Sequence, residues 1–154
     1  MRHALILGAG TAGTMLANRL RRSLDHDQWR VIVVDRDDDH VYQAGLLEVV
    51  FGHREPGQLV RSRSAQIAEG VSVVKGEIDL VDTDARTVHL ADGRHLSYDQ
   101  LVIATGTSPH PEETPGMAGW LWRRSVHEFY TLEGARALHD ALDTFRTGRL
   151  VVHV

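Results

Sequence analysis

The feature that most restricts the fold of this chain is a short apolar strand that runs directly into three spaced glycines. Residues 4–7 read Ala-Leu-Ile-Leu and lead into the pattern G-x-G-x-x-G, formed by Gly8, Gly10 and Gly13. Leucines then recur every fourth residue, which predicts a helix over 12–24. The pattern predicts a strand, a tight turn and a helix in that order.

Each of the three glycines has its own expected role at this turn. Gly8 permits the tight bend out of the strand, Gly10 lets a ligand approach the backbone, and Gly13 lets the helix pack closely on the strand. The N–H groups of residues 11–13 point outward at the helix start, where the helix carries roughly half a positive charge. We therefore predict a loop that binds a pyrophosphate.

A second apolar run, over residues 30–35, ends in an aspartate. Asp35 follows Gly13 by 22 residues, and a carboxylate at the end of this second strand can accept both hydroxyls of a ribose. Asp35 and the acidic residues 37–39 would also repel a 2′-phosphate, although Arg36 weakens that repulsion. Strand, glycines, helix, strand and acid in this order predict dinucleotide binding, and they leave NAD and FAD open.

Composition excludes several other classes of protein. The net charge of −4 provides no basic patch for nucleic acid. No apolar run approaches the ~20 residues that cross a bilayer, and no signal peptide is present, so we expect a cytoplasmic protein. The chain has no cysteine, which excludes disulfides and thiolate nucleophiles within it. Its ten histidines lack the spacing of metal ligands, so we expect no metal site.

The remaining elements are predicted from periodicity and from turn residues. Asp92-Gly93 between alternating residues is a strong hairpin signal. After the second strand, the patterns predict a short apolar helix within 42–53 closed by Gly52, a helical stretch from Glu55-Pro56 to about Ala68, and a strand over 71–80. The hairpin follows, and then a strand over 101–104. The last part of the chain is predicted to form an extended connector, a helix over 131–145 and a strand over 149–154.

The region after the second strand favours FAD over NAD. A classical NAD domain would continue with further β-α-β units, whereas this chain has an antiparallel meander and then the strand in "YDQLVIATGTSP". This layout resembles the flavin domain of the pyridine nucleotide–disulfide oxidoreductase superfamily. The resemblance implies FAD as cofactor and an α/β fold, a Rossmann-type parallel sheet with flanking helices and a small antiparallel β-meander.

Two further stretches resemble the sulfide:quinone oxidoreductase branch of that superfamily. They are "VYQAGLLEVVFG" and "HEFYTLEGARAL", although members commonly have proline at the positions of Ala44 and Val50. The resemblance implies sulfide and quinone as partners of the intact family. It covers only the first part of a member, and a later segment completes the flavin site and supplies any peripheral membrane contact. We therefore expect this chain alone to be inactive, and one family cysteine position holds Tyr130.

The resemblance also assigns cofactor-binding residues, but no catalytic ones, to positions of this chain. These positions comprise the pyrophosphate loop, the ribose carboxylate with its arginine neighbour, two residues toward the flavin ring, the adenine edge and the end of the strand over 101–104. They are Gly8, Gly10, Thr11, Ala12, Gly13, Asp35, Arg36, Gln43, Gly45, Ile78, Thr105 and Gly106.

We expect an FAD-binding segment over 1–107, a connector over 108–130, and a helix and strand over 131–154 that begin a second nucleotide-binding domain. Two other interpretations stay open. One is a truncated, non-catalytic domain that forms homo-oligomers or pairs with a partner chain through its last strand. The other is part of a type II NADH dehydrogenase-like flavoprotein.

Overall fold

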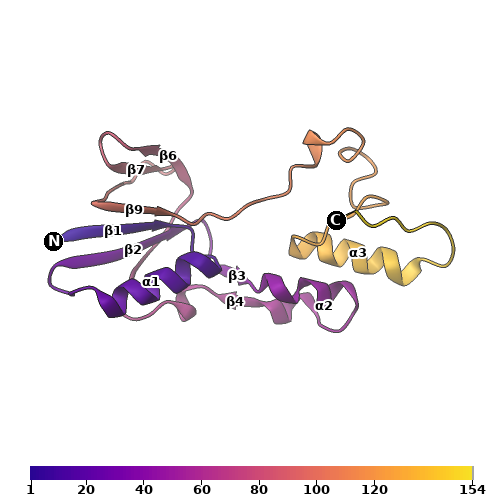
Figure 1. Cartoon of the computed structure of the whole chain (residues 1–154), viewed down its shortest axis with the longest axis horizontal. Coiled ribbons are helices and arrows are strands. Elements are labelled where there is room, and N and C mark those ends of the chain that lie inside the picture. The colour runs from indigo at the N-terminus through magenta and orange to yellow at the C-terminus, as the bar shows by residue number, and fades with distance from the viewer. Residues whose placement is uncertain (154) are drawn as a thin grey trace. The chain divides into compact units, whose positions relative to one another are not determined.

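The computed structural model describes residues 1–153 (Figure 1). The chain divides into two compact units. The first, here called the sheet unit, contains Met1–His40 and Arg61–Thr107. The second, here called the helical unit, contains Val41–Val60 and the chain from Ser108 onward.

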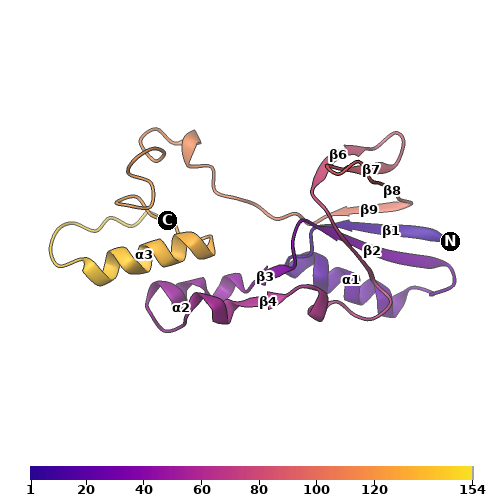
Figure 2. The same cartoon turned by 180° about the vertical axis from the view of Figure 1, so that it is seen from behind.

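The sheet unit is built on a parallel sheet of four strands in the order β5-β2-β1-β9. Helix α1 connects β1 to β2 and lies along one face of this sheet (Figures 1 and 2). The predicted β-α-β unit and the predicted strand over 101–104 are therefore confirmed. The bounds are β1 Arg2–Leu7, α1 Thr11–Ser23, β2 Trp29–Asp35, β5 Ser72–Lys75 and β9 Gln100–Ile103.

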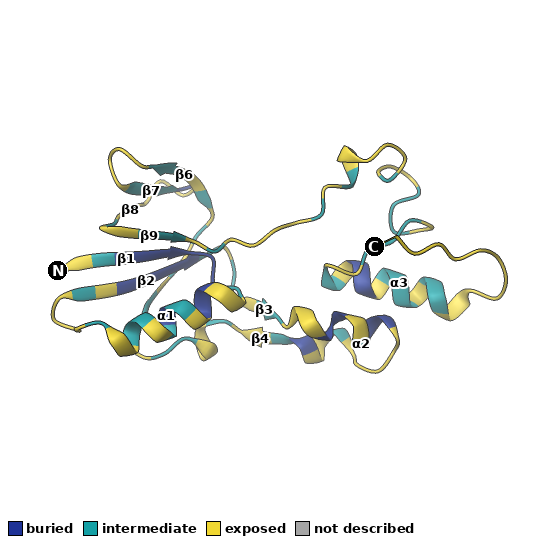
Figure 3. Cartoon of the chain, in the orientation of Figure 1, coloured by how far each residue is buried: buried dark blue, intermediate teal, exposed yellow. Residues whose placement is uncertain are grey.

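The two central strands are buried on both faces over residues 4–7 and 31–34, which explains why these stretches are continuously apolar (Figure 3). Successive side chains of a strand point to opposite faces of the sheet. Leu5 and Leu7 of β1 therefore pack with Val88 and Leu90 of the meander on one face. On the other face, Ile6 packs with Ala17 of α1. Because Leu7 pairs with Val34, the carboxyl ends of β1 and β2 lie level with each other.

An antiparallel meander covers the face of the sheet opposite α1. It consists of β6 Ile78–Asp82, β7 Thr87–Leu90 and β8 His95–Ser97, and the predicted hairpin at Asp92-Gly93 joins the last two. The single strand predicted over 71–80 is wrong, since the chain forms β5 and β6 in different sheets. The break falls at Gly76, whose N–H donates to the Asp35 carbonyl (2.9 Å) before the chain leaves the parallel sheet.

The long helical stretch predicted from Glu55-Pro56 to about Ala68 is also wrong. The chain forms the short 3₁₀ helix η2 Pro56–Leu59, the strand β4 Val60–Ser62 paired with β3 Asp39–Val41, and the 3₁₀ helix η3 Ser64–Gln66. Helix propensity is a weak preference that tertiary contacts override. Here the backbone N–H of Arg63 donates to the Asp38 carbonyl (2.7 Å), so this segment bonds to the loop after β2 instead of to itself.

The helical unit packs two helices against each other. Leu46, Val49 and Val50 of α2 form a buried cluster with Ala135 of α3. Thr131 caps α3, because its Oγ1 accepts from the Gly134 N–H (2.9 Å). The predicted helix over 131–145 and the short helix within 42–53 are thus confirmed. The bounds are η1 Gln43–Gly45, α2 Leu46–Val50, η4 Pro111–Glu113 and α3 Leu132–Thr144.

The strand predicted over 149–154 does not form in residues 149–153, and Val154 lies outside the described residues. Leu150, Val151 and Val152 are exposed. A strand is stable only beside a hydrogen-bonded neighbour, and within the described part of the chain none pairs with this segment. Within residues 1–153, no helix combines the length and the apolar character that crossing a membrane requires.

We predict that Leu5→Ala destabilises the protein by about 2–5 kcal/mol, because it removes a fully buried side chain between the sheet and the meander. Urea unfolding followed by circular dichroism measures the change. Leu80→Ala removes a leucine that is 56% exposed and serves as the matched control, with little expected effect. Equal losses for the two variants would contradict the assignment of this core.

Candidate functional site

The turn between β1 and α1 is held close by two glycines. Gly8 has a φ of +95°, which L side chains rarely adopt, and its N–H donates to the Val34 carbonyl (2.8 Å). A Cβ on Gly8 would overlap the carbonyl of Ala104, and a Cβ on Gly13 would overlap the carbonyl of Gly8. The strand-to-helix turn is therefore tight, and it lies against the end of β9.

The start of α1 is open at Gly10. Gly10 is the N-cap residue, no side chain accepts the first N–H groups of the helix, and the first turn holds no acidic residue. The first N–H groups of an α-helix have no partner within the helix, so those of Thr11, Ala12 and Gly13 are available. A Cβ on Gly10 would meet no atom within 4 Å. These features suit an anion that approaches the loop closely.

The carboxylate of Asp35 lies directly beside this loop. Its Oδ2 accepts from the Ala9 N–H (2.6 Å) and its Oδ1 accepts from the Arg36 N–H (2.8 Å). The Asp35 side chain is 13% exposed. The structure therefore places the acid at the end of β2 against the glycine turn.

Arg63 completes the surroundings of Asp35, and sequence reasoning did not identify it. Its Nη1 lies 2.6 Å from Asp35 Oδ2, and its Nη2 lies 3.2 Å from Asp37 Oδ1. The Arg63 side chain is 15% exposed. No local pattern marks this arginine, because the two acids it bridges are more than 25 residues away in the chain.

Asp38 fastens the loop after β2 to the segment that carries Arg63. Its Oδ2 accepts from Ser62 Oγ (2.6 Å) and its Oδ1 accepts from the Ser64 N–H (2.9 Å). The hydroxyl of Ser62 and then the N–H of Ser64 lower the pKa of Asp38 below its ordinary value, since both bonds favour the charged form. These bonds hold the residues on either side of Arg63.

Four other predicted site residues also lie in the sheet unit. Thr105 and Gly106 follow β9, and a Cβ on Gly8 would touch the Cα of Thr105, so this segment borders the glycine turn. Ile78 begins β6 two residues after Gly76, which bonds to the end of β2. Arg36 is exposed, since 79% of its side chain is accessible.

The remaining two predicted residues, Gln43 and Gly45, belong to η1 in the helical unit. Gly45 is buried, and a Cβ there would press on Leu59 and Tyr42. The packing of its own unit therefore explains this glycine without a ligand. Gln43 is exposed.

The sheet unit thus gathers a free helix N-terminus and a carboxylate at the carboxyl ends of neighbouring parallel strands. This edge is where open α/β sheets bind nucleotides. The N–H groups suit a diphosphate, and the carboxylate suits a ribose hydroxyl. Within residues 1–153, no three histidine, aspartate or glutamate side chains gather in a way that could hold a metal ion.

The chain matches a known family and several known proteins. The model of the family described as "Pyridine nucleotide-disulphide oxidoreductase" matches residues 2–152. The mitochondrial sulfide:quinone oxidoreductase of Mus musculus is 26% identical over 144 residues, which is 94% of this chain and 32% of the mouse protein. The sulfide:quinone oxidoreductase structure from Aquifex aeolicus matches with a TM-score of 0.75 at 18% identity, covering 93% of this chain and 32% of that one.

Other relatives have different names. The probable ferredoxin reductase CtmF of Castellaniella defragrans is 30% identical over 143 residues, which is 90% of this chain and 33% of that protein. A type II NADH:quinone oxidoreductase of Staphylococcus saprophyticus is 28% identical over 116 residues, covering 75% of this chain and 28% of that protein. The chain spans about a third of the length of these relatives. The matches confirm the resemblance on which FAD was inferred, and the fold that it implied.

We predict different losses of stability for alanine at two glycines of the turn. Gly13→Ala forces a Cβ onto the Gly8 carbonyl and should cost about 1–3 kcal/mol of the free energy of unfolding. Gly10→Ala points its Cβ into open space and should change stability by less than about 1 kcal/mol. Urea unfolding measures both changes, and a Gly10 variant that lost as much stability as the Gly13 variant would contradict the geometry of the loop.

We also predict that Ser62→Ala raises the pKa of Asp38 toward its ordinary value, because the variant removes the first hydrogen bond that lowers it. The stabilising effect of Asp38 is fully present above about pH 4 and is lost as the pH falls through the lowered pKa of the folded state. NMR titration of the Asp38 carboxyl carbon measures this shift. Ser97→Ala on β8 is the control, and an unchanged pKa in Ser62→Ala would refute the assignment.

Proposed function

Because the chain belongs to the pyridine nucleotide-disulphide oxidoreductase family, a family of FAD-binding oxidoreductases, we propose that it is the FAD-binding module of a sulfide:quinone oxidoreductase-like flavoprotein. The module binds the adenosine diphosphate half of the cofactor in the sheet unit. Orientation and electrostatics are the usual contributions of a protein to a flavin.

One observation carries the proposal, namely the open start of α1 beside the carboxylate of Asp35. The N–H groups of Thr11, Ala12 and Gly13 would bind the diphosphate, and the helix dipole would favour its negative charge. Asp35 would accept a hydrogen bond from the adenosine ribose. Both groups are already in place, because Asp35 is bonded to the Ala9 N–H of the same loop.

FAD fits the sheet unit better than NAD does for a reason of topology. A classical NAD domain continues with β-α-β units after its second strand, whereas here the meander β6-β7-β8 precedes β9. The flavin, when bound, accepts electrons from a donor and passes them to an acceptor. The residues of this chain bind and orient the adenylate end, with Thr105 and Gly106 beside the diphosphate.

Sulfide and quinone are proposed as substrates of the whole flavoprotein, on the similarity to the mouse enzyme. A step in which a cysteine carries sulfur has no candidate residue here, because the sequence contains no cysteine. We therefore expect the chain by itself to bind FAD without oxidising sulfide. Among the alternatives, a type II NADH dehydrogenase-like flavoprotein is favoured by the Staphylococcus relative.

The experiment for the proposed function measures FAD binding to the purified chain by the quenching of flavin fluorescence. The wild-type chain should bind FAD. Gly10→Ala should weaken that binding at least about tenfold, because its Cβ fills the space in front of the loop, and tenfold corresponds to about 1.4 kcal/mol.

Gly57→Ala is the matched control, since its Cβ also meets no atom within 4 Å but lies in η2, away from the glycine loop in the sequence. A wild-type chain that binds no FAD at 100-fold excess would refute the proposal. Equal affinities of wild type and Gly10→Ala would refute the assigned loop.

A further inference from the structure

The acceptor positions of the Asp35 carboxylate are nearly all in use before any ligand binds. An ionised carboxylate offers about four lone-pair positions, two on each oxygen. Oδ2 accepts from the Ala9 N–H and from Arg63 Nη1, both at 2.6 Å. Oδ1 accepts from the Arg36 N–H at 2.8 Å. One acceptor position is left, and it is on Oδ1.

The Arg63 guanidinium is firmly held in its place on Oδ2. Only 15% of its side chain is exposed, and its second terminal nitrogen lies 3.2 Å from Asp37 Oδ1. Its backbone N–H donates to the Asp38 carbonyl, and Asp38 also binds Ser62 and Ser64 on either side of it. The buried Nε has no hydrogen-bond partner within the described chain, so the two aspartates determine where the guanidinium lies.

The charges around the Arg63 guanidinium explain why its displacement from Asp35 would be costly. Asp35 and Asp37 are both within hydrogen-bond reach of the guanidinium, and the Asp35 side chain is only 13% exposed. Removing one member of a buried ion pair leaves an uncompensated charge. A ribose hydroxyl, which is neutral, cannot replace the guanidinium in that role.

We propose that Arg63 is a specificity-determining residue that makes Asp35 an acceptor for a single ribose hydroxyl. A ribose presents two adjacent hydroxyls, and a carboxylate free on both oxygens could accept both. With Oδ2 filled by Ala9 and Arg63, only the position on Oδ1 accepts from the sugar. This inference rests on the proposed binding of an adenosine diphosphate group and deepens it.

The test measures binding of ADP, 2′-deoxy-ADP and 3′-deoxy-ADP to the purified chain by competition with FAD. In wild type, one deoxy analogue should bind as ADP does and the other about fivefold to tenfold more weakly, as expected for one lost hydrogen bond. Arg63→Met frees the second position on Oδ2, so both analogues should then bind more weakly than ADP. Arg63→Lys retains a donor for Asp35 and should restore the pattern of wild type.

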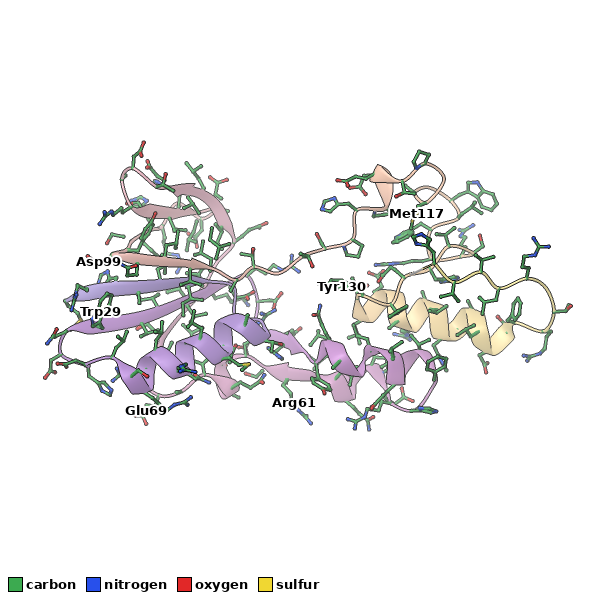
Figure 4. All side chains as sticks on the ribbon, viewed as in Figure 1. Trp29, Arg61, Glu69, Asp99, Met117 and Tyr130 are labelled. Atoms are coloured by element: carbon green, nitrogen blue, oxygen red, sulfur yellow. The ribbon has the colours of Figure 1, made fainter. Side chains whose placement is uncertain are left out.

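Arg61→Met is the matched control, because it removes the same charge two residues away. Arg61 is exposed and its side chain extends away from the ribbon (Figure 4). The Arg61→Met variant should show the same pattern of analogue binding as wild type. Equal losses for both analogues in wild type, or an unchanged pattern in Arg63→Met, would overturn the role of Arg63 while FAD binding stands. Absence of binding by FAD and ADP alike would overturn the proposed function and this inference together.

Discussion

Removing a carboxylate from water is expensive unless hydrogen bonds and an opposite charge compensate it, and the sheet unit is organised around one such largely buried group. Asp35 receives the N–H of Ala9 from the glycine turn and the guanidinium of Arg63 from the segment after β4. These bonds join the turn, the end of β2 and a distant segment at one point. The start of α1 is therefore fixed in position by the same acid that, in the proposed function, meets the ribose.

The three glycines of the turn serve two different purposes. Gly8 and Gly13 lack side chains because backbone atoms occupy the space where a Cβ would be. Gly10 faces open space, so the protein alone does not explain its lack of a side chain. Under the proposed function, a cofactor phosphate at this position would explain it, since a Cβ would hold the phosphate away from the amides.

In the proposed function, the chain is a binding module. For that role the chain offers amides, a carboxylate and an arginine, and it contains no cysteine that could carry sulfur. It spans about a third of the length of its relatives, whose names include sulfide, ferredoxin and NADH partners. The family match over residues 2–152 includes the glycine turn and Asp35, and a fold of this kind does not by itself identify the electron partners.

The sequence by itself determined what depends on neighbouring residues. Strand, glycines and helix are local patterns, Asp92-Gly93 is a local turn signal, and Asp35 is located by counting from the glycines. Only the tertiary structure decided what depends on distant partners. Asp38 holds Ser62 and Ser64 over more than 20 residues, so this segment ends the strand β4 and begins the 3₁₀ helix η3 in place of the long helix predicted from Glu55-Pro56. Arg63 pairs with Asp35 for the same reason: its partner lies far along the chain, and only folding brings opposite charges at such separations into contact.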